Sequence, residues 1–246
     1  MNQKQNLFPN LREIFLRRVY LFLYGSREGV SLNFLQKNAN GVFLSTEEFM
    51  IKSKLNYSDL QKDLGTAKSL YKKVLEEHRH ITSEGWNAEL ELFSLLYILV
   101  KSKKPKILVE TGVANGITTN SIMFALNEND NSGFLHSFDI LPETRNSNLI
   151  EANWIFHLLE KKKTNKHFSR IIENLPKIDI WLHDSNHGYR WQKFEYLLAI
   201  RRLNRDGILI SDDVDASSAW GEVIPKYFKE SYIIFDSRRF IGIAHN

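Results

Sequence analysis

The chain has 246 residues, a formal net charge of +4 at pH 7 and no cysteine. This length suits one α/β domain with an accessory segment, and the lack of cysteine excludes disulfide bonds. The small charge, without Lys and Arg clustered among aromatic residues, argues against a nucleic-acid partner. The Lys- and Asn-rich composition is typical of a soluble bacterial protein, so we expect a cytoplasmic location.

Residues 1–80 are expected to form an accessory helical segment, and residues 81–246 a separate domain. The apolar stretch from Leu11 to Tyr24 contains three arginines and predicts a helix. Because these arginines do not segregate to one face, docking on the core or pairing as a homodimer is favoured over binding to a membrane surface.

Two further stretches complete the accessory segment. Residues 25–41 contain turn residues and are interpreted as an irregular connection. Residues 46–78 have a helical pattern that could cover the mouth of a crevice and shape an acceptor pocket. The apolar stripe of this pattern consists of Leu55, Leu60, Leu64, Leu70, Tyr71 and Val74.

The longest apolar run of the chain is Leu92 to Val100, nine residues broken by Ser94. It is too short for a membrane span, which needs about 20 apolar residues, and predicts a helix packed on a sheet. Residues 19–24 are also too short for the apolar core of a signal peptide, and no clean small-residue cleavage site follows them. We therefore expect no membrane span and no secretion signal.

The stretch from Lys106 to Thr119 predicts a strand, a glycine-bearing turn and a helix over 117–126. Gly112 and Gly116 allow a tight turn and a close approach of the backbone to a ligand. The amides at the start of the helix are expected to point into a crevice.

A second strand, residues 133–139, ends in Asp139, an acid suited to accept hydrogen bonds from both hydroxyls of a ribose. The dinucleotide pattern G-x-G-x-x-G is absent. This counts against NAD and FAD and leaves another nucleoside-type cofactor.

Two apolar runs near the C-terminus, 178–183 and 207–211, each break into acids. This pattern is typical of buried parallel strands whose ends open into a crevice. Asp184, Asp212 and Asp213 would lie side by side there. Three carboxylates without cysteine suit Mg²⁺, Mn²⁺ or Ca²⁺ rather than zinc. Because three neighbouring acids repel one another, a cation neutralises them or at least one binds a proton.

Each of these acids also has a purely structural interpretation. Asp212 and Asp213 could solvate a strand end, and Asp184 could form a turn with the next two residues. The functional interpretation is preferred for all three, given their grouping. For His187, a catalytic base and a packing or exposed residue remain equal alternatives.

Four nearby residues are interpreted as structural. His183 would lie on the opposite face of its strand, and Asp215 would cap a helix that begins over 216–220. Arg238 and Arg239 precede the last strand, 241–244, and are interpreted as hairpin-turn residues with solvated charge.

Here the chain resembles a known family. Glu110-x-Gly112-x-Ala114-x-Gly116 resembles motif I of the class I S-adenosylmethionine (SAM)-dependent methyltransferases, and Asp139 resembles their ribose-binding acid. Three further stretches look like a bacterial subgroup of small-molecule methyltransferases related to the metal-dependent sugar and catechol O-methyltransferases. They are His183–Tyr189, Phe194–Tyr196 and Ser211–Val214. The resemblance covers roughly residues 83 to 246 and implies a Rossmann-like doubly wound α/β sheet.

The resemblance also implies roles for individual residues. Glu110, Gly112, Ala114 and Gly116 would line the methionine and ribose of SAM, and Thr118 would meet the methionine carboxylate. Asp139 would hold the ribose diol. Asp184, Asp212 and Asp213 would bind Mg²⁺ or Mn²⁺, with Asp184 also in the catalytic set, and His187 would remove the acceptor's proton. The strand candidate 154–158 lacks the family's following glycine, so no residue is assigned to the adenine pocket.

The resulting expectation is a SAM-dependent, divalent-metal-dependent O-methyltransferase. Its acceptor would be a small hydroxylated molecule such as a sugar or a glycosylated metabolite. His187, with an ordinary pKa near 6.5 that nearby carboxylates would raise, would take the proton as neutral imidazole. Two alternatives stay open: a metal-independent methyltransferase, and a SAM-binding or inactive domain that serves as an interaction module.

Overall fold

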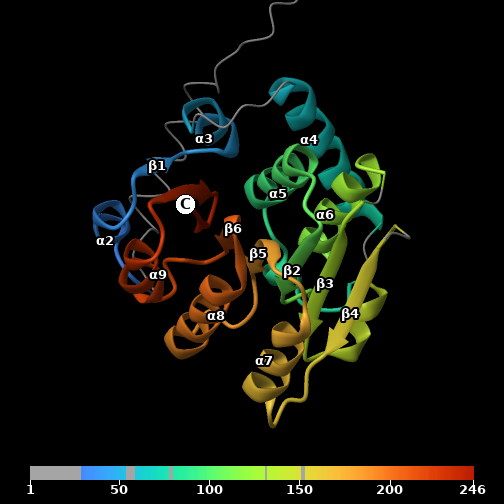
Figure 1. Cartoon of the computed structure of the whole chain (residues 1–246). Helices are drawn as coiled ribbons and strands as arrows, with labels where there is room; N and C mark the ends of the chain where they lie inside the picture. Colours follow the sequence, from blue (N-terminus) through green and yellow to red (C-terminus); the bar gives the residue numbers. More distant parts are fainter. Residues whose placement is uncertain (1–28, 54–58, 78–79, 131, 151–152) are drawn as a thin grey trace, which may run out of the picture.

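The computed structural model describes residues 29–53, 59–77, 80–130, 132–150 and 153–246 (Figure 1). The expected helix over residues 11–24 and the homodimer contact proposed for it lie outside these ranges. In the ranges that are described, no helix is both long and apolar enough to span a bilayer.

One sheet of eight strands forms the centre of the fold, in the order β1-β7-β8-β6-β5-β2-β3-β4. The strands are β1 (Gly41–Phe43), β2 (Ile107–Thr111), β3 (Phe134–Asp139), β4 (Trp154–Leu158), β5 (Ile178–His183), β6 (Leu203–Ser211), β7 (Glu230–Asp236) and β8 (Arg239–His245). Only β8 is antiparallel to its neighbours, β6 and β7. The strand order reverses between β2 and β5, and a crevice at the carboxyl ends of such strands is the usual ligand site. The expected doubly wound sheet is confirmed.

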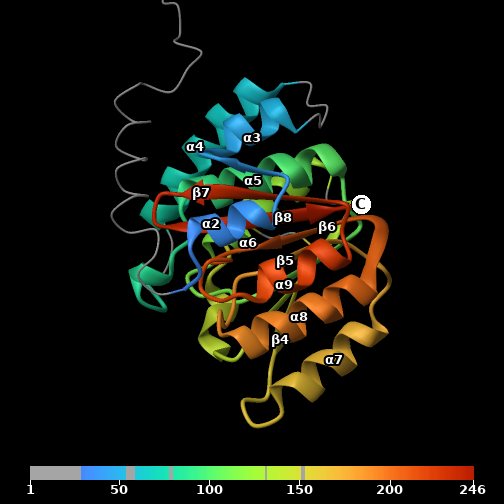
Figure 2. The ribbon, with the colours of Figure 1, turned by 90° about the vertical axis from the view of Figure 1, so that its left-hand side faces the viewer.

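Helices cover both faces of this sheet; Figure 2 shows α3, α4 and α5 above it and α7, α8 and α9 below. The helices are α2 (Leu32–Lys37), α3 (Thr46–Lys52), α4 (Leu60–Glu77), α5 (Leu90–Lys103), α6 (Ile117–Glu128), α7 (Thr164–Asn174), α8 (Tyr189–Arg202) and α9 (Ala219–Val223). Short 3₁₀ turns span Glu84–Trp86, Pro142–Asn146 and Ile224–Lys226.

Strand side chains alternate between two apolar cores, one on each face. Leu108 and Ile180 pack with α4, α5 and α6, whereas Val109 and Trp181 pack with α7, α8 and α9. Because both faces are buried, the central strands read as continuous apolar runs in the sequence. The same alternation decides which way each side chain at a strand end points.

Residues 29–43 differ from the irregular connection expected there. Ser31 caps α2 by accepting a hydrogen bond from Phe34 N at 3.3 Å, and Leu35 of this helix is fully buried. β1 then pairs in parallel with β7, a strand almost 190 residues later in the chain. Pairing of this kind is invisible to local sequence patterns, which is why the expectation was wrong.

The accessory segment is built onto the sheet. Phe49 of α3 lies 5.5 Å from the ring centroids of both Phe43 and Tyr232. Thr46 N donates to a carboxylate oxygen of Glu91, on α5, at 2.7 Å. Helices α3 and α4 account for most of the helical pattern expected over 46–78, and its described apolar stripe does pack on the core.

Candidate active site

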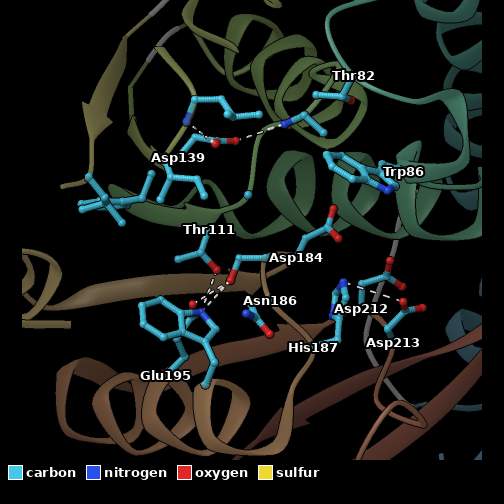
Figure 3. Close-up of a pocket in the computed structure, with 18 of the residues that line it drawn as sticks. Thr82, Trp86, Thr111, Asp139, Asp184, Asn186, His187, Glu195, Asp212 and Asp213 are labelled. Atoms are coloured by element: carbon cyan, nitrogen blue, oxygen red, sulfur yellow. Dashed lines mark hydrogen bonds and ion pairs between the residues drawn. The ribbon is translucent and has the colours of Figure 1, made fainter. Parts of the chain in front are cut away.

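A cavity of about 1110 Å³ opens at the carboxyl ends of β2, β3, β5 and β6. Figure 3 shows Asp139 towards one end of it and Asp212, Asp213 and His187 towards the other, with Asp184 between them. Ligand pockets have volumes of about 300–1,000 Å³, so this cavity has room for a cofactor and a second small molecule together.

The turn between β2 and α6 forms one wall of the cavity. Gly112, Ala114 and Gly116 all have positive φ, at 82°, 47° and 78°. A Cβ on Gly112 would lie 1.9 Å from the carbonyl oxygen of Asp184, so only glycine lets this turn approach the end of β5. Gly112 and Ala114 line the cavity. Gly116 instead faces Ser147, whose Oγ would be 2.5 Å from an added Cβ.

Asp139 lies at the end of β3 and holds this turn. One of its carboxylate oxygens accepts hydrogen bonds from Val113 N at 2.9 Å and Ala114 N at 3.3 Å. The other oxygen accepts from Leu141 N at 2.9 Å. Each carboxylate oxygen offers two lone pairs, so the second oxygen retains capacity for a ligand hydroxyl. Asp139 lines the cavity, as the expected ribose-binding role requires.

Glu110 and Thr118 are not among the residues that line the cavity. Glu110 is fully buried and accepts hydrogen bonds from Thr118 at 2.7 Å, Thr119 at 2.8 Å and Ser137 at 2.6 Å. Burial raises the pKa of Glu110 to about 7, although the three hydroxyls act in the opposite direction. Strand alternation turns Glu110 towards α6, so both residues brace the turn instead of facing a cofactor.

Asp184, Asp212 and Asp213 line the cavity together, as expected. Burial raises the pKa of Asp184, and repulsion by Asp212 and Asp213 adds to the rise. The pKa of Asp212 is raised to about 8 by burial and then by Asp213. Both shifts favour the protonated form of these carboxyls.

The chemistry of this donor set fits a hard divalent cation, because oxygen ligands with excess negative charge are what Mg²⁺ and Mn²⁺ prefer. The carboxylate oxygens, however, do not surround a position for an ion. Among the described residues, no group of three or more His, Asp or Glu side chains is arranged to hold a metal.

His187 follows β5 in a loop and lines the same part of the cavity. Its Nε2 lies 3.7 Å from a carboxylate oxygen of Asp213. Burial lowers the pKa of His187 to about 4, and this outweighs the upward effect of Asp213. The expectation of a raised pKa was therefore wrong: desolvation of the imidazolium exceeds the attraction of the neighbouring carboxylate. At neutral pH the imidazole is uncharged and able to accept a proton.

Glu195 of α8 is a lining residue for which the sequence predicted no role. It accepts hydrogen bonds from Thr111 Oγ1 at 2.7 Å and Ser185 Oγ at 2.8 Å, and it pairs with His183 Nδ1 at 2.7 Å. His183 is fully buried, in agreement with its structural interpretation. The partners of Glu195 lie on β2, on β5 and directly after β5, so only the tertiary structure brings them together.

The contacts of Arg238, Arg239 and Asp215 differ from the structural roles expected for them. Arg238 and Arg239 line the cavity and are paired rather than simply solvated. Arg238 Nε lies 2.6 Å from Glu89, and Arg239 lies 3.4 Å from Asp215. Asp215 also accepts from Phe240 N at 3.3 Å and is not a helix cap, because α9 begins later, after Ser218.

The sequence also predicted no role for Trp86. It lies in a cavity-lining segment that precedes α5, and its side chain is 64% exposed. Figure 3 shows it with Thr82 along the wall across from His187. Leu159, directly after β4, and Asn165 and Phe168 of α7 also line the cavity, although the glycine expected after β4 is absent. No local sequence signal marks these positions.

A family described as "Methyltransferase domain" matches residues 109–214, which run from β2 to the residue after Asp213. Residues 109–214 are thus similar to a methyltransferase domain. This region contains Asp139, Asp184, Asp212 and His187, so every side chain discussed for cofactor, acids and base lies within the match. No curated protein matches the chain at a significant level.

The fold is also similar to that of several solved structures. The O-methyltransferase TomG from Streptomyces achromogenes, in complex with SAM, is 13% identical and has a TM-score of 0.52, covering 82% of this chain and 96% of its own. The O-methyltransferase from Bacillus cereus with SAH is 12% identical, with a TM-score of 0.44 and coverage of 82% and 98%. The SAH-bound methyltransferase PaMTH1 from Podospora anserina is 11% identical, with a TM-score of 0.49 and coverage of 98% of both chains.

At 13% identity the comparison with TomG supports the fold alone, a doubly wound α/β sheet. The function must be argued from the site itself, because one fold supports many activities.

Proposed function

We propose that this methyltransferase domain transfers a methyl group from SAM to a hydroxyl of a small molecule such as a sugar or a glycosylated metabolite. One observation carries the proposal. A single cavity joins the glycine turn and Asp139 at one end to Asp184, Asp212, Asp213 and His187 at the other. A cofactor at the first end and an acceptor at the second would meet in the middle.

The cofactor end is supplied by backbone and one acid. Gly112 and Ala114 would allow SAM to lie against the turn, and Asp139 would accept hydrogen bonds from the ribose. Glu110, Gly116 and Thr118 would act indirectly by holding the turn in shape. Two apolar residues, Leu159 after β4 and Phe168 of α7, would border the adenine.

The acceptor end is supplied by acids. Asp184, Asp212 and Asp213 would hold Mg²⁺ or Mn²⁺, and such an ion lowers the pKa of a bound hydroxyl and orients it. The raised pKa values of Asp184 and Asp212 mean that each carboxyl would have to lose its proton to act as a ligand. Arg239, 3.8 Å from Asp213, limits the negative charge at the rim.

His187 would act as the general base. Its low pKa keeps the ring neutral, and its Nε2 faces the cavity near Asp213, where the acceptor hydroxyl would lie. Proton removal and positioning are the two contributions that methyl transfer to oxygen needs from the protein. An imidazole with a pKa of about 4 is a weak base, so it suits a hydroxyl that a cation has already acidified.

A metal-independent methyltransferase is the second candidate. The absence of a three-ligand arrangement among the described residues favours it. In this case Asp184 and Asp212 would contact the cofactor and the acceptor directly.

A cytoplasmic bacterial setting is proposed from composition alone. A division into residues 1–80 and 81–246, with a homodimer formed through the N-terminal segment, is likewise a proposal. Gel filtration with light scattering of the whole chain and of residues 29–246 tests the dimer.

The deciding experiment is transfer of a labelled methyl group from SAM to a panel of sugars, glycosides and catechols, with Mg²⁺ and with EDTA. Transfer that requires Mg²⁺ supports the main proposal, and transfer undiminished in EDTA supports the metal-independent candidate. Binding of SAM without transfer to any member of the panel would leave the interaction module as the better interpretation.

A further inference from the structure

Asn115 lies between Ala114 and Gly116 in the cofactor turn, and its side chain is fully buried. Its Oδ1 accepts hydrogen bonds from Ile81 N at 2.9 Å and Thr82 N at 2.8 Å. Its Nδ2 donates to Asn87 Oδ1 at 2.7 Å and to Thr82 O at 3.4 Å. A side-chain amide has two lone pairs and two N–H groups, so all four of its hydrogen-bonding positions are directed to one segment, residues 81–87.

This segment carries Trp86 along the wall of the cavity (Figure 3). Because the indole is 64% exposed, packing against the protein does little to place it. The backbone anchors of the segment must therefore place it. A second anchor is Arg238, which donates to Asn87 O at 3.0 Å and to Gly85 O at 3.4 Å.

The two anchors differ in what they connect. Arg238 belongs to the β7–β8 turn, at the edge of the acid end of the cavity. Asn115 belongs to the turn that Asp139 holds through Val113 N and Ala114 N. The carboxylate of Asp139 is thus connected to the backbone of Ile81 and Thr82. The connection consists of hydrogen bonds to the turn, the backbone of the turn, and the hydrogen bonds of the Asn115 side chain.

We propose that Asn115 is a positioning residue that couples occupancy of the cofactor turn to the segment 81–87, and so sets Trp86 against the acceptor. The inference rests on the proposed SAM-dependent function. A cofactor seated on Gly112 and Ala114 restricts the turn, and Asn115 passes that restriction to two backbone amides of the segment. Coupling of this kind is reciprocal, so a well-placed segment also strengthens cofactor binding.

The amides of Ile81 and Thr82 report this directly, because both donate to Asn115. Hydrogen exchange of the whole chain is measured with and without S-adenosylhomocysteine, whose affinity is determined separately by calorimetry. We expect the ligand to slow exchange of these two amides by about 5-fold or more, the low end of ordinary coupling energies. In Asn115→Ala the ligand still binds, but the slowing at 81–82 is lost.

Asn120→Ala is the matched control. Asn120 is also buried and borders the same turn, but its side chain bonds Gly116 O, Ser147 O and Leu149 N instead. This variant retains the slowing at 81–82. If Asn115→Ala fails to fold, Asn87→Ala tests the same connection. It removes the hydrogen bond from Asn115 Nδ2 to Asn87 Oδ1 without a buried substitution in the turn, and it should reduce the slowing at 81–82.

Different results would contradict the proposed function and the role of Asn115. Absence of S-adenosylhomocysteine binding to the wild-type chain would overturn the proposed function together with this inference. Binding with unchanged exchange at Ile81 and Thr82, or with the slowing retained in Asn115→Ala and Asn87→Ala, would overturn the inference alone.

Discussion

Asp184 and Asp212 follow the neighbouring strands β5 and β6, and the charge of Asp212 adds to burial in raising the pKa of Asp184. Burial and the charge of Asp213 raise the pKa of Asp212 to about 8. A divalent cation at this place competes with protons for these carboxyls, because metal ligands must be deprotonated.

Mg²⁺ binding is expected to tighten as the pH rises from about 6 to 9. Asp212 must lose a proton held with a pKa of about 8, and this cost disappears above that pH. Calorimetry at three pH values, in low salt, measures the change. Asp213→Asn should weaken binding at every pH, whereas Asp206→Asn, an exposed acid on the same strand, should not. Binding that is independent of pH would remove Asp212 from the ligand set.

The melting temperature in EDTA is expected to fall as the pH rises from about 4 to 8. In this range the unfolded chain releases the proton of Asp212, whose ordinary pKa is about 3.9, while the folded chain keeps it up to about 8. The folded state binds more protons there, so its stability declines with pH. Asp212→Asn should show a smaller decline and a higher melting temperature at pH 8. An unchanged slope in this variant would contradict the raised pKa.

His187→Ala is expected to lower kcat by about 10²–10⁴-fold and to leave SAM affinity nearly unchanged, because a general base acts only in the chemical step. For the wild type at saturating metal, protonation of His187 should reduce the rate only as the pH falls towards about 4. Single-turnover rates across pH test both. Near-normal kcat with a raised acceptor KM would mean that His187 positions the acceptor without taking its proton.

Asp139→Ala is expected to weaken SAM or S-adenosylhomocysteine binding at least tenfold, since hydrogen bonds to a charged group contribute about 1.5–3 kcal/mol. The variant would lose the proposed hydrogen bonds from the ribose. It would also lose the hydrogen bonds from Val113 N and Ala114 N that hold the turn. Calorimetry measures the affinity, and a melting curve shows whether the fold survives. Equal affinity in the variant and the wild type would exclude Asp139 from the site.

Phe49→Ala is expected to destabilise the whole chain by about 3–5 kcal/mol, as for other large buried aromatic residues. Phe49 is fully buried between β1 and β7, so its loss should loosen the accessory segment from the sheet. Ile51→Ala, at a 62% exposed position of the same helix, should change stability by less than about 0.5 kcal/mol. Denaturant unfolding with one shared transition would show that residues 29–77 fold with the domain.

The sequence by itself determined the class of the sheet and the position of its functional end. Strands β2, β3, β5 and β6 are buried along most of their length, so their apolar runs stand out locally, and glycines or acids mark where they stop. Asp139, Asp184, Asp212 and Asp213 could be placed at one crevice for this reason alone. The carboxyl ends of parallel strands must lie on the same edge of a sheet.

Only the tertiary structure decided which way side chains point and what surrounds them. Glu110 belongs to the motif that resembles a cofactor site, yet strand alternation turns it towards α6 and three hydroxyls. His187 has a low pKa because burial outweighs the charge of Asp213, a balance of desolvation and distance that no spacing encodes. Trp86 reaches the cavity because Asn115 and Arg238, respectively 29 and 152 residues later in the chain, hold its segment. Contacts between residues so far apart in sequence are set by packing, and packing is a property of the folded chain.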